Sequence, residues 1–460
     1  MLTVQEAAQA LQADWYGDNV VFTSVSTDSR TVQPGDLFVA LSGERFDGHQ
    51  FIISARDQGA VAAMVDKKTD HTLSLPEFGW LSVQDTRLGL GQLSSFWRTR
   101  FSLPLVAVTG SNGKTTVKEM IASIFSEAVK KKIKEKNSAS GSVLATLGNL
   151  NNDIGVPLML LRLRDYHRYA VIEMGMNHLG EIAYLTQLAK PTVAVITNAG
   201  AAHIEGLGSV EAVAQAKGEI FNGLTNDGIA IINADDRYAF LWRKLAGKIR
   251  VIDFGIDQPA QITAQPWSGD GKTAWQMNFP GDSVTFHLQV PGRHNICNAL
   301  AAAAAAFAVG IDQHTIVAGL TAFAGVQGRM QKKRGLHNAI LIDDTYNANP
   351  ESMRAALAVL ADTPGKRILV LGDMGELGPD AAEFHHQIGV EASHVGIEKL
   401  FTLGDLSEHA AKGFGKGAQH FTSIEALLAA AEKSLDIGVT MLVKGSRFMQ
   451  MERVIKRLER

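Results

Sequence analysis

Short runs of Val, Ile, Leu and Ala recur along this chain, and each is followed by a stretch with helical periodicity. Near-continuous apolar runs are typical of parallel strands buried on both faces, with helices as the crossovers between them. The sequence therefore predicts an α/β protein with mainly parallel sheets, whose ligands bind at the carboxyl ends of the strands. The clearest predicted strands cover residues 105–109, 169–173, 192–198, 229–233, 250–253, 339–343, 367–372, 400–404 and 440–445.

The length of 460 residues predicts three domains, at about 150 residues per domain. The first would cover residues 1–85, the second residues 86–312 and the third residues 313–460. Within the second, residues 260–290 alternate polar and apolar side chains around Gly-Asp turns, which predicts a small antiparallel meander. The alanine-rich run at 299–309 predicts a helix packed closely against a sheet.

Composition excludes several classes of protein. With 44 Lys and Arg against 47 Asp and Glu, the chain lacks the basic field of a general nucleic-acid binder, and the basic run at 130–136 is typical of a solvated helix end. The single cysteine, Cys297, excludes intramolecular disulfides and Cys-cluster metal sites. No apolar run reaches the about 20 residues that cross a bilayer, and Glu6 and Asp14 interrupt the region where a signal peptide is apolar. We expect a cytoplasmic protein without membrane insertion.

The sharpest local motif is TGSNGKTT, which follows the predicted strand 105–109 and precedes a helical pattern. Glycines allow backbone N–H groups to surround a phosphate chain, and the helix N-terminus adds partial positive charge. Lys114 would reach the β- and γ-phosphates, and the Thr115 hydroxyl would bind Mg²⁺. The loop is short, since Val108 stands where most phosphate loops have their first glycine. The predicted phosphate site consists of Gly110, Ser111, Asn112, Gly113, Lys114, Thr115 and Thr116.

Cation ligands would follow neighbouring strands. Glu173 ends one predicted strand, and it is either a Mg²⁺ ligand or a carboxylate that caps the next turn. His203 follows the strand at 192–198, and its residue type fits a solvated loop as well as a ligand. Lys217 lies in a helical pattern, whose periodicity alone favours a surface lysine.

Longer motifs run in one order through the whole chain, and together they resemble the Mur ligases, the ATP-dependent amide-forming enzymes of peptidoglycan assembly. These motifs are STDSR, PGDLFVAL, GERFDGH, TGSNGKTT, GNLNNDIGVPL, EMGMNHLGEI, TNAGAAHIEGLGS, AKGEIF, GRHNICNALAAAA, GRM, DDTYNANPESMRAAL, LGDMGELG and VKGSR.

The resemblance implies an N-terminal α/β domain that binds a UDP-linked substrate, a central P-loop domain that binds ATP, and a C-terminal Rossmann-like domain. It is strongest to the member that joins D-Ala-D-Ala to UDP-MurNAc-tripeptide through an acyl phosphate, giving UDP-MurNAc-pentapeptide. It implies Mg²⁺ as a cofactor and a monomeric enzyme. The third residue of the tripeptide, diaminopimelate or lysine, stays open.

The resemblance also implies a role for individual residues. Lys114, Lys217, Arg329 and His203 would act in catalysis, and Lys217 would carry a CO₂-derived carbamate. The metal ligands would be Thr115, Glu173, His203 and the modified Lys217. The nucleotide contacts outside the phosphate loop would be Asn295, Arg329, Asp343, Asp344 and Asn347, with the choice between the two aspartates open. The other substrates would meet Thr27, Asp28, Ser29, Arg30, Asn149, Asn151, Asn152, Lys444, Ser446 and Arg447.

Three other functions stay open from the sequence. Folylpolyglutamate synthases resemble the chain in the phosphate loop but lack DDTYNANP and the UDP-site motifs. The ligase that adds the third residue of the stem peptide typically carries an Asp-Asn-Pro-Arg motif, which is not found here. A P-loop switch without ligase activity needs only the phosphate loop, which leaves Glu173 and the third domain unexplained.

Overall fold

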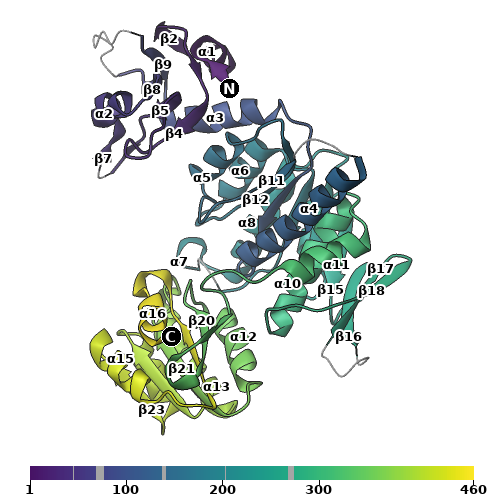
Figure 1. Cartoon of the computed structure of the whole chain (residues 1–460), viewed down its shortest axis with the longest axis vertical. Helices are drawn as coiled ribbons and strands as arrows, with labels where there is room; N and C mark the ends of the chain where they lie inside the picture. Colours follow the sequence, from purple (N-terminus) through teal and green to yellow (C-terminus); the bar gives the residue numbers. More distant parts are fainter. Residues whose placement is uncertain (45, 69–76, 137–140, 202–203, 268–273) are drawn as a thin grey trace.

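The computed structural model describes residues 1–44, 46–68, 77–136, 141–201, 204–267 and 274–460. Its chain forms three α/β units in series, with the N-terminus in the first and the C-terminus in the third (Figure 1). Each unit has its own main sheet, of five, nine and six strands. The predicted fold class is thereby confirmed.

The first sheet has the strand order β2-β9-β8-β5-β4 and is parallel except for the edge strand β2. Short strands and helices surround it, and α3 (Thr86–Arg98) continues from it onto the central unit. The other elements are β1 (Leu2–Thr3), α1 (Val4–Leu11), β2 (Asp14–Gly17), β3 (Val21–Phe22), β4 (Ser24–Ser26), β5 (Asp36–Val39), β6 (Ser42–Gly43), β7 (Phe46–Asp47), α2 (Ile52–Asp57), β8 (Ala62–Asp66) and β9 (Gly79–Val83).

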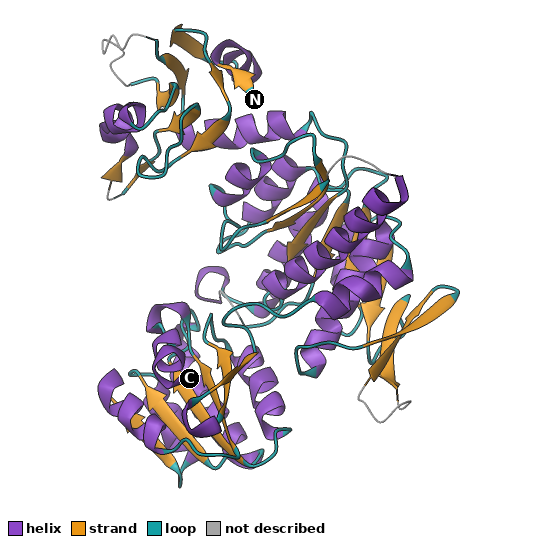
Figure 2. Cartoon of the chain, viewed as in Figure 1, coloured by secondary structure: helices purple, strands orange, loops and turns teal. Residues whose placement is uncertain are grey.

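The central sheet has the order β11-β12-β10-β13-β14-β15-β16-β17-β18 and is parallel from β11 to β16. Its last three strands form the predicted antiparallel meander, which extends from the body of the unit (Figure 2). Its strands are β10 (Leu105–Thr109), β11 (Ser142–Ala145), β12 (His167–Glu173), β13 (Val193–Ile196), β14 (Ile229–Asn233), β15 (Arg250–Gly255), β16 (Ile262–Trp267), β17 (Ala274–Phe279) and β18 (Asp282–Phe286).

Helices cover both faces of this sheet, because alternate residues of each strand enter different apolar clusters. Val106 and Val108 of β10 join one cluster, with side chains of α4, α10 and α11, whereas Leu105 and Ala107 join the other, with side chains of α3, α5, α6, α8 and α9. The helices are α4 (Lys114–Lys136), α5 (Gly155–Leu160), α6 (Glu181–Ala189), α7 (Ile204–Leu207), α8 (Val210–Gly218), α9 (Ala239–Ala246), α10 (Arg293–Ala308) and α11 (Gln313–Ala322).

The alanine-rich helix α10 is buried along most of its length, and each residue from Ala299 to Ala306 is at most 1% exposed. It contacts α4 and the strands from β13 to β16. Methyl side chains allow this close approach to the sheet, and they hold the start of the helix, at Arg293, beside the carboxyl ends of the strands.

The third sheet has the order β19-β20-β24-β21-β22-β23, parallel apart from the edge strand β19. Apolar clusters on both of its faces hold the helices in place. Its elements are β19 (Gln331–Arg334), β20 (Ile340–Asp344), α12 (Pro350–Ala361), β21 (Lys366–Gly372), α13 (Ala381–His394), β22 (Lys399–Leu403), α14 (Ser407–Phe414), β23 (Ala418–Phe421), α15 (Ile424–Lys433), β24 (Val439–Lys444) and α16 (Glu452–Leu458).

Helix α11 packs on α4 of the central unit, although it follows the predicted boundary at residue 312. A Cβ at Gly319 would lie 2.4 Å from the Ile124 Cα, and the Ser123 hydroxyl donates to the Gly319 carbonyl at 2.7 Å. We therefore propose that the third domain begins after α11. None of the helices in the described ranges is long and apolar enough to span a membrane.

Candidate active site

A cleft of ≈ 770 Å³ lies between the central and third domains. Its walls come from the phosphate loop, the ends of β12 and β13, the start of α10 and the segment that follows β20. Carboxyl ends of parallel strands from two sheets thus face one space, as expected for ligand binding in α/β proteins. The predicted site residues that line it are Ser111, Asn112, Gly113, Lys114, Thr116, Asn151, Asn152, Glu173, Asn295, Arg329, Asp344, Asn347 and Lys444.

The phosphate loop is held in shape by Asn198, which follows β13. The Asn112 N–H donates to the Asn198 Oδ1 at 2.8 Å, and the Asn198 Nδ2 donates to the Asn112 carbonyl at 3.0 Å. Gly113 has φ +84°, and a Cβ there would lie 2.4 Å from the Asn298 Oδ1, so both conformation and space require glycine. Contacts within the central domain therefore hold the loop in this shape.

Glu173 ends β12 next to the phosphate loop, since Val108 of β10 pairs with it. The residue is only 2% exposed, and its Oε1 accepts a hydrogen bond from the Asn151 Nδ2 at 2.9 Å. Its Oε2 is buried and has no hydrogen-bond partner among the described residues. A buried carboxylate oxygen without a partner is costly, and a bound cation would remove that cost.

This chain offers a magnesium ion few acidic ligands. The described part of the chain holds no group of three or more His, Cys, Asp or Glu side chains that could bind a metal. Mg²⁺ is commonly bound by one or two protein oxygens, together with substrate phosphates and water. The Glu173 carboxylate and the Thr115 hydroxyl fit that pattern.

Lys217 lies in α8 and is 1% exposed, so its interpretation as a surface lysine is wrong. Burial, and then the charge of Lys114, lower the pKa of Lys217 well below its usual value. Burial also lowers the pKa of Lys114, an effect that Glu173 opposes and Arg329 reinforces. Lys217 is thus a buried lysine whose ammonium form is disfavoured by burial and by the charge of Lys114.

Arg329 reaches from the third domain to the phosphate loop. Its Nη2 donates to the Thr115 hydroxyl at 2.9 Å, and its guanidinium lies over the ring of Tyr346, 4.2 Å from the centroid. The Arg329 Nε is buried without a partner among the described residues. A cation held by an aromatic ring and directed at this loop can neutralise phosphate charge.

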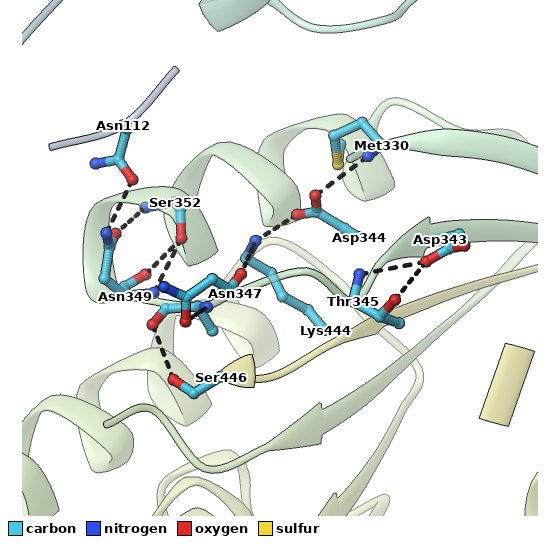
Figure 3. A network of polar contacts seen from close by, with 11 residues as sticks. Asn112, Met330, Asp343, Asp344, Thr345, Asn347, Asn349, Ser352, Lys444 and Ser446 are labelled. Carbon is cyan, nitrogen blue, oxygen red and sulfur yellow. Dashed lines mark hydrogen bonds and ion pairs between the residues drawn. The ribbon is translucent and has the colours of Figure 1, made fainter. Parts of the chain in front are cut away.

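Two further contacts join the domains at the start of α12. The Asn349 Nδ2 donates to the Asn112 Oδ1 at 2.8 Å, shown at the left of Figure 3. The Glu351 Oε1 accepts a hydrogen bond from the Ala201 N–H at 3.0 Å. Our sequence prediction missed Tyr346, Asn349 and Glu351. A signal was present for one of them, because Asn before Pro is typical of a helix start, and Asn349 is indeed the N-cap of α12.

The third-domain wall is a network of polar contacts around Lys444 (Figure 3). Lys444 is 3% exposed, and its Nζ pairs with Asp344 at 2.5 Å and donates to the Asn347 carbonyl at 2.9 Å. Asp344 also accepts from the Met330 N–H at 3.1 Å. The neighbouring Asp343 accepts from Thr345 and lies 3.5 Å from the Lys333 Nζ, away from the cleft. Of the two predicted aspartates, Asp344 is the one at the cleft.

Several predicted residues lie elsewhere. Ser446 donates to the Ala348 carbonyl at 3.2 Å, and Arg447 forms an exposed ion pair with Glu452, so neither lines the cleft. Asn149 does not line it either, whereas Asn295 does, 4% exposed, with its Nδ2 bonded to the Pro291 carbonyl at 2.7 Å. His203 lies outside the described residues.

The predicted cluster in the first domain follows β4, in a turn away from the cleft. Arg30 donates to both carboxylate oxygens of Asp28, at 2.9 and 2.7 Å, and these bonds lower the pKa of Asp28 to about 2. Thr27 precedes Asp28, and Ser29 lies between the two residues of this pair. An Arg fork and hydroxyl groups at an exposed turn are suited to a pyrophosphate.

Comparisons with known proteins extend over the whole chain. The model of the Mur ligase middle domain matches residues 108–306, that of the Mur ligase glutamate ligase domain residues 328–447, and that of the Mur ligase family catalytic domain residues 21–98. UDP-N-acetylmuramoyl-tripeptide–D-alanyl-D-alanine ligase of Escherichia coli (strain K12) is 42% identical over 466 residues, which cover 100% of this chain and 98% of the relative.

Solved structures agree. A crystal structure of MurF from Acinetobacter baumannii has a TM-score of 0.88 at 35% identity, covering 99% of this chain and 98% of that one. MurF from Thermotoga maritima in complex with ADP has a TM-score of 0.81 at 28% identity, and the match covers 96% of this chain and 98% of that one. Because the family models follow the order of the three sheets and these relatives align from end to end, the chain belongs to the Mur ligase family.

Proposed function

We propose that this chain is an ATP-dependent ligase that joins D-Ala-D-Ala to UDP-MurNAc-tripeptide in peptidoglycan precursor synthesis. The observation that carries this function is the cleft between the central and third domains, where the phosphate loop faces Arg329 and Asp344. The end-to-end similarity to UDP-N-acetylmuramoyl-tripeptide–D-alanyl-D-alanine ligase supports the choice of substrates.

The reaction makes an amide from a carboxylate, which is a poor electrophile. The terminal carboxylate of the tripeptide attacks the γ-phosphate of ATP and forms an acyl phosphate. The amine of D-Ala-D-Ala then attacks the acyl carbon, and phosphate leaves. Because two anions approach each other in the first step, neutralisation of charge dominates its barrier. Lys114, in the first turn of α4, and Arg329, from the third domain, supply fixed positive charge on two sides of the phosphates.

Thr115 and Glu173 would hold a Mg²⁺ ion, together with His203 and with Lys217 in a modified form. When bound, the ion neutralises phosphate charge and orients the terminal phosphate. The Arg329 guanidinium donates to the Thr115 hydroxyl, so we expect Arg329 to move away before this hydroxyl binds a cation. Asn151 fixes the orientation of Glu173, which keeps one carboxylate oxygen directed away from the amide.

Lys217 would carry a carbamate formed with CO₂. Only the neutral amine reacts with CO₂, and the burial that lowers the pKa of Lys217 favours that form. An ammonium group next to Lys114 would repel a cation, whereas a carbamate is an anionic oxygen ligand.

The remaining predicted residues divide between the substrates. Asn295, Asp344 and Asn347 would contact the nucleoside of ATP, since they lie on the wall beside the phosphate loop. Asn151 and Asn152 would face the peptide part of the UDP-linked substrate, with Asn149 in support. Thr27, Asp28, Ser29 and Arg30 would bind its UDP part. Lys444, with Ser446 and Arg447, would order the third-domain side, and the chain would act as a cytoplasmic monomer.

The test is release of phosphate from ATP by the purified protein, with each substrate omitted in turn. We expect release only when both UDP-MurNAc-tripeptide and D-Ala-D-Ala are present, together with a UDP-linked pentapeptide detected by mass spectrometry. Release with folate and glutamate, or with a single amino acid in place of the dipeptide, would identify a different ligase. Release that needs neither acceptor substrate would indicate a nucleotide switch and contradict the proposal.

A further inference from the structure

One buried charge of the central domain is not used by the proposed reaction. Lys118 lies in α4, about one helical turn after Lys114, and it is 1% exposed. Its Nζ donates to the Thr146 carbonyl at 2.9 Å and pairs with the Glu119 carboxylate. A protein interior often accepts an apolar side chain of similar size in place of a buried, paired charge without loss of stability. Stability alone therefore does not account for a lysine at this position.

Thr146 connects this ammonium group to the end of β12. The residue directly follows β11 and is 1% exposed. Its N–H donates to the Val171 carbonyl at 3.1 Å, and its hydroxyl accepts a hydrogen bond from the Glu173 N–H at 2.9 Å. Both the backbone and the side chain of Thr146 are thus bonded to β12, while its carbonyl is bonded to Lys118.

The two proposed cation ligands stand at the two ends of this series of contacts. Thr115 lies in α4 three residues before Lys118, so the two side chains are neighbours on one face of the helix. Glu173 lies at the other end, where its N–H is bonded to Thr146 and its buried Oε2 has no partner among the described residues. Ligands on two separate elements can bind one ion only if those elements keep a fixed spacing. The contacts of Lys118 and Thr146 fix that spacing.

Helix α4 is attached to β12 by other contacts as well. The Lys132 Nζ donates to the Tyr169 hydroxyl at 2.7 Å, and the Phe125 ring stacks on the Tyr169 ring with 4.5 Å between the centroids. Tyr169 precedes Glu173 by four residues in the same strand. Because these contacts already hold the helix on the sheet, Lys118 is not needed for attachment. Its contact acts at the end of the strand that carries Glu173.

We propose that Lys118 is a positioning residue for the cation site, which holds Glu173 at a fixed place relative to Thr115 through its contact with Thr146. This inference rests on the cation site of the proposed function. Groups that contact metal ligands orient those ligands, and their replacement commonly lowers metal affinity about 10- to 100-fold. Lys118 itself touches neither the ion nor a substrate.

The test measures cation binding rather than turnover. Mn²⁺, which takes the same oxygen ligands as Mg²⁺, is titrated into the whole protein with a non-hydrolysable ATP analogue, and free Mn²⁺ is followed by its EPR signal, with the analogue alone as the reference. We expect Lys118→Met, which removes the ammonium group but fills its space, to raise the Kd for Mn²⁺ about 10-fold. Thr146→Val, which loses the hydroxyl bonded to the Glu173 N–H, should have a similar effect. Thr146→Ser keeps that hydroxyl and should bind Mn²⁺ nearly normally.

Two further variants separate positioning from a general loss of charge or packing. The double variant Lys118→Met/Thr146→Val should bind Mn²⁺ about as weakly as either single variant, because both changes break one series of contacts. Lys132→Met is the matched control, since it removes another lysine that bonds α4 to β12, and its Kd should be unchanged. Thermal unfolding checks that each variant is folded.

A folded Lys118→Met protein with an unchanged Kd for Mn²⁺ would overturn the inference. An equal loss of affinity in Lys132→Met would overturn it too, because any weakening between α4 and β12 would then have this effect. If Lys118→Met does not fold, an unchanged Kd in Thr146→Val has the same meaning. An unsubstituted protein that binds no Mn²⁺ with the analogue would overturn the cation site and the inference together. Normal Mn²⁺ binding without ligation of D-Ala-D-Ala would contradict only the proposed substrates.

Discussion

Replacing Lys114 by alanine should lower kcat for ligation about 1,000-fold, the loss expected when a preorganised group that stabilises transition-state charge is removed. Lys114 begins α4, and its Nζ donates to the Gly110 carbonyl at 2.8 Å, so the side chain folds back over the phosphate loop. Its charge would lie where the γ-phosphate meets an attacking carboxylate. The measurement is steady-state phosphate release with both substrates saturating.

The fold should survive this substitution, because no buried apolar contact depends on the Lys114 ammonium. Thermal unfolding checks that point. Lys130→Ala is the matched control, since Lys130 is an exposed lysine of the same helix that pairs with Glu127 at 2.7 Å. We expect full activity from it. Near-normal turnover by a folded Lys114→Ala protein would refute the assignment of the phosphate loop.

Replacing Lys217 by alanine should lower kcat about 100- to 1,000-fold, and short carboxylates such as formate or acetate should restore part of the activity. The substitution removes a buried side chain and leaves a space next to Lys114. A small anion can enter that space and replace the oxygen atoms of the carbamate. Activity is measured against carboxylate concentration, with chloride at equal ionic strength as the reference.

Lys217→Met is the matched control for this rescue, because it removes the amine but fills the space. It should be as inactive as Lys217→Ala, and carboxylates should not restore it. Carboxylates should not rescue Lys114→Ala either, since the missing group there is a cation. Full activity of Lys217→Ala without any added anion would show that the lysine has only a structural role.

Much of the fold could be predicted from apolar runs. Strands such as β10 and β14 are buried throughout, and their sequences LVAVT and IAIIN contain little else than Val, Ile, Leu and Ala. The two edge strands of the third sheet, β19 (QKKR) and β23 (AQHF), escaped prediction because much of their surface meets solvent. Edge strands carry no continuous apolar run, so the pattern that identifies buried parallel strands cannot find them.

The candidate site was predictable only where a motif is local. The phosphate loop and Glu173 lie at strand ends, where sequence order is enough. Lys217 was misjudged from helical spacing, which does not show that its side chain is buried and feels the charge of Lys114. Strand alternation implies that Asp343 and Asp344 point to opposite faces, but only the packed sheet shows which faces the cleft.

Contacts between the domains could not be predicted from the sequence for a different reason. Arg329 and Thr115 are separated by 214 residues, and Asn349 and Asn112 by 237. No periodicity relates such positions, because the way two folded units dock depends on their complete surfaces. The family resemblance placed Arg329 near the phosphates, whereas the Tyr346 ring that supports it emerged only from the structure.

A crystal structure with a non-hydrolysable ATP analogue and Mg²⁺ tests the central claim most directly. We predict that the β- and γ-phosphates lie on residues 110–116, with the metal ion at Thr115 and Glu173 and with Arg329 moved from the Thr115 hydroxyl onto phosphate. A structure in which the nucleotide binds elsewhere and this loop remains without phosphate would contradict the account.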